Sequence, residues 1–150
     1  AANYARTDLV CFLADDPISL REEQTAAWDP WRRWAGDALG IWLVAAEGLS
    51  APEQPETSIE AVSTHADALD DFRLTGLLLG VGLFGSAVLG LAVERRALSA
   101  RDELELSRLE EAHQQRTWGE DAEAARVLDR RRHEAAQLDV WFKALEEAAG

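Results

Sequence analysis

The longest apolar stretch of the chain covers residues 74–93, with the sequence LTGLLLGVGLFGSAVLGLAV. None of its twenty positions carries a charged side chain, and Asp71, Arg73, Glu94 and Arg95 flank it. Twenty helical residues rise about 30 Å, which matches the hydrocarbon thickness of a bilayer. The pattern therefore predicts one transmembrane helix over residues 74–93.

A buried core helix is the alternative interpretation of this stretch. Five glycines weigh against it, because each costs about 1 kcal/mol relative to alanine in an aqueous helix. Membrane helices carry glycine more often than helices in water do. A core helix also seldom lacks a polar stripe over its whole length. These points favour the transmembrane interpretation.

Small residues recur at steps of four or seven residues along the stretch and so lie on two faces of the predicted helix. Such residues let a second helix approach closely, so that dispersion contacts accumulate where hydrophobicity supplies no driving force. We therefore expect a neighbouring protein helix to pack on at least one of these faces, which are formed by Gly76, Gly80 and Ala87 and by Gly82, Ser86 and Gly90.

Residues 29–48 have the pattern of an amphipathic helix. Asp29 can cap it, Pro30 suits the first helical position, and Gly48 suits the position after the last turn. Helical spacing places three tryptophans on one face: Trp31, Trp34 and Trp42. This face fits the boundary between lipid headgroups and hydrocarbon, and it equally fits a partner protein.

The rest of the chain divides at proline, glycine and capping signals. The predicted segments are an irregular part with a short helix (1–28), a proline-bearing linker (49–56), a long helix that contains the membrane span (57–116), a break (117–119) and an amphipathic heptad helix (120–150). The heptad helix predicts a helical hairpin or a coiled-coil-like extension, although an amphipathic helix of a globular unit fits the same spacing. The predicted fold class is thus all-α, with a single transmembrane helix and flanking amphipathic helices.

Charge and composition exclude several classes of function. The formal net charge of −13 disfavours binding to nucleic acid. Cys11 is the only cysteine, so an intramolecular disulfide and a cysteine-rich metal site are excluded. No titratable side chain lies within 74–93, which argues against a proton relay or haem ligation there. Phosphate-loop, dinucleotide and serine-hydrolase motifs are absent. We therefore expect no catalytic, cofactor-binding or metal-binding residues, and no enzyme.

Together these features predict a non-catalytic, single-pass accessory subunit of a larger membrane complex. By analogy, small subunits of respiratory and photosynthetic assemblies have this build. The expected partners are other membrane subunits, contacted through the membrane helix, and the lipid bilayer. The alternative is a homo-oligomeric membrane anchor or signalling relay that associates through its C-terminal heptads.

Basic residues near the span predict its orientation. The N-terminal flank has Arg73, whereas the C-terminal flank has Arg95, Arg96, Arg101 and Arg108. The positive-inside rule counts these charges and places the richer side in the cytoplasm. The N-terminus is therefore predicted to be extracytoplasmic, or in the lumen or intermembrane space of an organelle.

Overall fold

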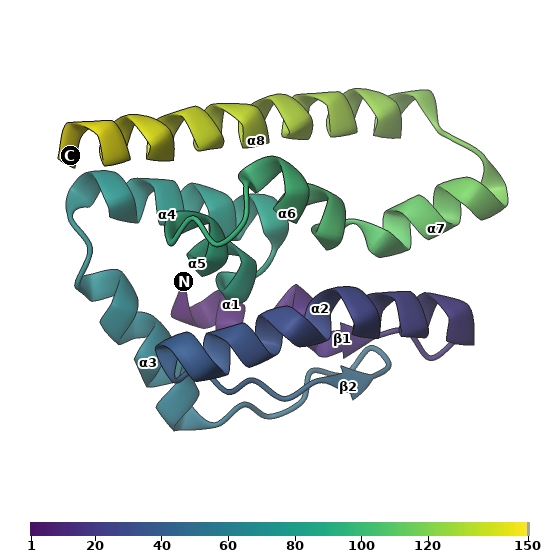
Figure 1. Ribbon diagram of the computed structural model, residues 1–150. Helices are drawn as coiled ribbons and strands as arrows, with labels where there is room; N and C mark the ends of the chain where they lie inside the picture. The colour runs from purple at the N-terminus through teal and green to yellow at the C-terminus, as the bar shows by residue number, and fades with distance from the viewer. Residues whose placement is uncertain (150) are drawn as a thin grey trace.

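The computed structural model describes residues 1–149, and 74% of these residues are helical. Helix α8 (Ala122–Ala149) runs along the top of Figure 1, above α4 (Asp71–Phe84) and α6 (Ala100–Ser107). Helix α2 (Ile18–Leu39) runs along the bottom of the view. The apolar stretch found in the sequence lies between these two outer layers, in α4 and the helix that follows it.

Residues 74–93 do not form one helix. Helix α4 ends at Phe84, and Gly85 takes a left-handed conformation with φ of 67°. Ser86 is extended, and its hydroxyl accepts a hydrogen bond from the first turn of α5 (Ala87–Glu94). Glycine adopts positive φ without steric cost, and serine is a strong N-cap, so the two residues together stop one helix and start another.

This break overturns the predicted transmembrane helix, and with it the membrane-spanning fold class. Within residues 1–149, no helix has both the length and the apolar character needed to cross a bilayer. The error came from reading an uninterrupted apolar composition as an uninterrupted helix. The apolar stretch instead folds back on itself, so that its two halves bury each other.

Helices α4 and α5 form a helical hairpin with its turn at Gly85 and Ser86. Asp8, which follows α1 (Ala2–Arg6), holds this turn in place. The Asp8 carboxylate accepts hydrogen bonds from the backbone N–H groups of Ala87 at 2.9 Å and Val88 at 3.1 Å. The N–H of Leu9 donates to the carbonyl oxygen of Gly85 at 3.1 Å. The first N–H groups of a helix lack partners within that helix, so this distant carboxylate satisfies donors that would otherwise be buried unpaired.

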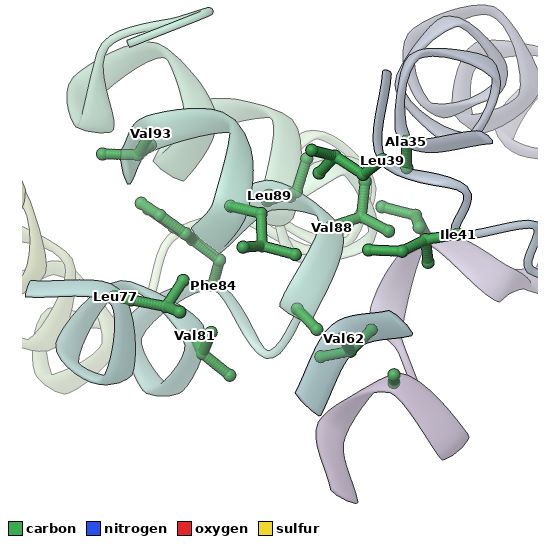
Figure 2. Packing of buried hydrophobic residues seen from close by; sticks show 14 of the residues in the cluster. Ala35, Leu39, Ile41, Val62, Leu77, Val81, Phe84, Val88, Leu89 and Val93 are labelled. Atoms are coloured by element: carbon green, nitrogen blue, oxygen red, sulfur yellow. The ribbon is translucent and has the colours of Figure 1, made fainter. Parts of the chain in front are cut away.

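Close approach between α4 and α5 depends on small residues. A Cβ atom on Gly90 would lie 2.5 Å from the Cγ2 atom of Val81, and one on Gly80 would lie 3.7 Å from the Cα atom of Gly90. Every residue of α5 is buried. Figure 2 shows side chains of both helices, including Phe84 and Leu89, in one cluster with residues of other elements.

Helix α8 packs antiparallel to α4 on the side away from α2 (Figure 1). Phe142 of α8 lies against Gly76, and Leu138 lies against Gly80. Further positions of the heptad pattern, Leu128 and Ala135, are also buried. The apolar face of the last helix is therefore covered within the same chain.

The N-terminal half differs from the helix expected over 29–48. Helix α2 begins at Ile18, ends at Leu39, and contains Pro30 in its interior. Gly40 terminates it with φ of 70°. The chain then runs extended, and β2 (Ala46–Glu47) pairs in parallel with β1 (Phe12–Leu13). Pro30 lacks the N–H that would bond the preceding turn, and a buried face of Leu20, Gln24, Trp28, Ala35 and Leu39 offsets that loss.

The range 57–116 also divides into shorter helices. Helix α3 (Glu56–Asp67) stops before Asp70, whose carboxylate caps α4 by accepting from the N–H of Arg73 at 2.8 Å. A short 3₁₀ helix (Leu9–Cys11) precedes β1 near the N-terminus. After α6, helix α7 (Leu109–Trp118) leads to Gly119 and the turn into α8. Asp70 and Gly119 therefore mark two of these boundaries, whereas α6 and α7 meet at Arg108 without a side-chain cap.

The contact between α4 and α5 generates a paired prediction. Gly90→Ala places a methyl group against Val81 and should lower the free energy of unfolding by about 1–3 kcal/mol through overpacking. Gly82→Ala, on an exposed position with no atom within 4 Å, should raise it by about 0.5–1 kcal/mol through helix propensity. Urea denaturation followed by circular dichroism measures both. Equal stability of the two variants would contradict the close packing described above.

Candidate interaction surface

The small residues predicted to pack against a partner helix lie mostly inside the fold. Buried positions among them are Gly76, Gly80, Ser86, Ala87 and Gly90, whereas Gly82 is exposed. The glycine neighbours belong to α4, α5 and α8 of the same chain. The predicted docking to other membrane subunits through these faces is therefore wrong, because the chain's own helices already occupy them.

The three tryptophans predicted to lie at a membrane interface are not on one helix face. Trp31 and Trp34 lie in α2, half-buried and edge to face, with ring centroids 5.7 Å apart. Trp42 follows the end of α2, and its ring packs on the backbone of Gly36. The ring covers part of α2, although about half of its surface remains exposed.

Buried titratable groups show no arrangement typical of catalysis. Cys11 is fully buried, and burial raises the pKa of its thiol to about 12, with the nearby Asp8 carboxylate adding to the shift. Such a thiol stays protonated and is a poor nucleophile. Among residues 1–149, no three histidine, cysteine, aspartate or glutamate side chains come together as a metal site.

Glu103 in α6 is the most unusual of these groups. Its side chain is fully buried, and neither carboxylate oxygen has a hydrogen-bond partner. Burial, together with the neighbouring charge of Asp102, raises the pKa of Glu103 to about 8. A buried carboxylate without a partner costs folding free energy, so this side chain destabilises the fold where it is charged.

An exposed apolar surface lies where α4 meets α8. Phe72, Leu79 and Leu83 are spaced seven and four residues apart, which places them along one line of α4. Together with Trp141 of α8, and with the buried Leu138 between the two helices, they form what we call the α4–α8 face. The face contains a hollow of about 390 Å³ lined by Leu79, Leu83, Glu134, Gln137, Leu138 and Trp141.

Trp141 is held on this face by contacts with the start of α4. Its indole N–H donates to the carbonyl oxygen of Phe72 at 3.0 Å, and the two rings are tilted with centroids 6.3 Å apart. Phe72 and Leu79 are each 62% exposed, and Trp141 is 38% exposed. Large apolar side chains gathered in this way mark surfaces that bind other molecules more often than isolated exposed residues do.

The sequence pattern did not single out Leu79 and Leu83, because both lie within the predicted membrane span. Inside a lipid span, an outward-facing leucine needs no explanation, so Leu79 and Leu83 carried no signal. The available clue was Gly85 followed by Ser86, a helix terminator next to an N-cap residue. A break at these residues divides the stretch into two short helices. Their apolar surface is larger than the contact between the two helices can bury, so some of it must face outward.

Comparisons with known proteins found no matching family model, but they found similar solved structures. Atp12 from Paracoccus denitrificans superimposes with a TM-score of 0.91 and 32% sequence identity over 95% of this chain and 61% of its own. A single-substitution mutant of that protein gives a TM-score of 0.88 and 32% identity over 94% of this chain and 62% of its own. A protein from Agrobacterium tumefaciens, provisionally named a chaperone, superimposes with a TM-score of 0.83. Its sequence identity is 31% over 93% of this chain and 53% of its own.

The chain thus spans about three fifths of the length of the Paracoccus proteins that it matches. The similarity overturns the predicted function of an accessory subunit in a membrane complex, and the alternative of a heptad-linked membrane anchor. The predicted integral-membrane location, with its N-terminus-out orientation and its lipid partner, is also wrong. Nearly the whole chain instead shares the fold of Atp12 from Paracoccus denitrificans.

Glu103 generates a prediction about pH. Its pKa in the folded protein, about 8, lies above the ordinary value of 4.5. The charged form is therefore disfavoured by folding, and stability is lost as the pH rises from about 4.5 to about 8. Glu103→Leu should match the wild type at pH 5 and exceed it by a few kcal/mol at pH 9.

Urea denaturation at pH 5, 7 and 9 measures this difference. Glu110→Leu, which removes an exposed carboxyl group from α7, controls for the loss of one negative charge. A gap between wild type and Glu103→Leu that does not grow with pH would show that Glu103 is not a buried, unpaired carboxyl group.

Proposed function

We propose that the chain acts as a non-catalytic assembly chaperone of the Atp12 type, and that its client is the α subunit of the ATP synthase. The observation that carries the proposal is the similarity to Atp12 from Paracoccus denitrificans, which extends over 95% of this chain with a TM-score of 0.91. An identity of 32% accompanies the shared fold.

The physical character of the surface supports a binding role. A chaperone shields apolar surface of an incomplete subunit until the final partner covers it, so it needs apolar area of its own rather than reactive groups. The α4–α8 face supplies such area, with Phe72 and Leu79 largely exposed. The negative charge of the chain opposes its self-association, and it attracts basic regions of a client.

The proposal predicts protection of the client from aggregation. The purified chain, added to unfolded ATP synthase α subunit as the denaturant is diluted, should lower the light scattering of the α subunit. It should also co-elute with the α subunit from a gel-filtration column, because exposed apolar surface on the client is covered in the complex. An unrelated acidic helical protein of similar mass serves as the control.

Unchanged scattering at excess chain, together with separate elution, would refute this client. Protection by the control protein to the same extent would show that the effect is a general one of charge and crowding. Neither outcome depends on the details of the α4–α8 face, so the experiment tests the function alone.

A further inference from the structure

The α4–α8 face offers a partner few free backbone groups. Both α4 and α8 are regular helices, so beyond their end turns the N–H and C=O groups are bonded along the helix axes. The indole N–H of Trp141 is already bonded to Phe72. A partner seated here must therefore satisfy its own backbone, because a buried and unpaired N–H or C=O group is costly.

A helix meets this requirement, whereas an extended strand does not. In a strand, the backbone groups facing the hollow would lose water without gaining a protein partner. The line from Phe72 to Leu83 is about 16 Å long at 1.5 Å per residue, which equals three turns of a helix. Helices that dock in grooves use apolar anchors spaced at i, i+4 and i+7, and one further anchor at i+11 extends this pattern to the same length.

Two exposed carboxylates flank the apolar line. Asp71 directly precedes Phe72, Glu134 lines the hollow, and both are exposed. The nearest basic group on α4, Arg73, is paired with the buried Glu94 at 3.7 Å. Carboxylates at a rim attract basic side chains on the edges of a partner and repel acidic ones, which sets its orientation and specificity.

We propose that the α4–α8 face binds an amphipathic helix of the client that carries an apolar stripe flanked by lysine or arginine. The hollow between Leu79 and Trp141 receives a large apolar anchor of this helix, since pockets of this kind concentrate binding energy at a few residues. This inference rests on the proposed function for the identity of the client.

Two designed peptides test the chemistry of the occupant. Each is a helix of about 14 residues with leucine at i, i+4, i+7 and i+11, and the edges carry lysine in one and glutamate in the other. Fluorescence anisotropy with the full chain should show tighter binding of the lysine peptide. Added salt should weaken that binding, because the charges at the rim are exposed to solvent.

Variants of the face test its location. Leu79→Gln should weaken binding of the lysine peptide about tenfold or more, because it replaces an apolar wall of the hollow by an amide. Phe72→Gln should weaken it in the same direction. Leu49→Gln makes the same change at a fully exposed leucine in the loop before α3, and it should leave binding unchanged. Circular dichroism confirms that each variant keeps the wild-type helix content.

Each outcome separates this inference from the proposed function. Equal affinity for the two peptides, or equal effects of Leu79→Gln and Leu49→Gln, would overturn the docking proposal. A wild-type chain that sediments as a dimer, and a Leu79→Gln variant that sediments as a monomer, would overturn it in favour of a second copy as the occupant. If Leu79→Gln protects the ATP synthase α subunit as well as the wild type does, the α4–α8 face is not the client-binding surface. The proposed chaperone function is unaffected by that result.

Discussion

The hydrogen bonds from α5 to the Asp8 carboxylate are the interaction on which the rest of the fold depends. They join residues almost 80 positions apart, and they supply acceptors to a helix N-terminus from which water is excluded. Because a buried helix end without partners is strongly disfavoured, α5 can enter the core only with this carboxylate in place. Burial raises the pKa of Asp8 to about 6 although three backbone N–H groups donate to it, so desolvation outweighs the capping bonds.

The outer surface follows from this arrangement. With α5 buried on all sides, the hairpin uses its shorter helix entirely for the core. The longer helix, α4, has more apolar surface than α5 and α8 can cover, and the remainder, including Leu79, faces outward. A segment with more apolar side chains than the core can bury leaves an exposed apolar surface that can bind a partner. This is consistent with a chaperone that holds an incomplete subunit.

Several local features could be inferred from the sequence because they depend on neighbouring residues. The spacing of Leu128, Ala135, Leu138 and Phe142 defines one face of a helix whichever partner covers it. Gly119 ends a helix through its own backbone freedom. The start of α2 could not be inferred from local residues. Asp29 and Pro30 have the pattern of a helix start, but the helix begins at Ile18 because its buried face extends back to Leu20. The α4–α8 face could not be inferred, since it brings Phe72 together with Trp141, 69 positions away.

The sequence by itself determined that the chain is helical, acidic and unusually apolar over residues 74–93, because propensity, charge and composition are properties of local segments. Only the tertiary structure decided that this stretch forms a buried hairpin rather than a membrane span. Both states bury most of the same apolar side chains, so hydrophobicity distinguishes them poorly. They differ in what satisfies the backbone N–H groups of Ala87 and Val88. In the folded chain this is the Asp8 carboxylate, which reaches them only when the chain has folded.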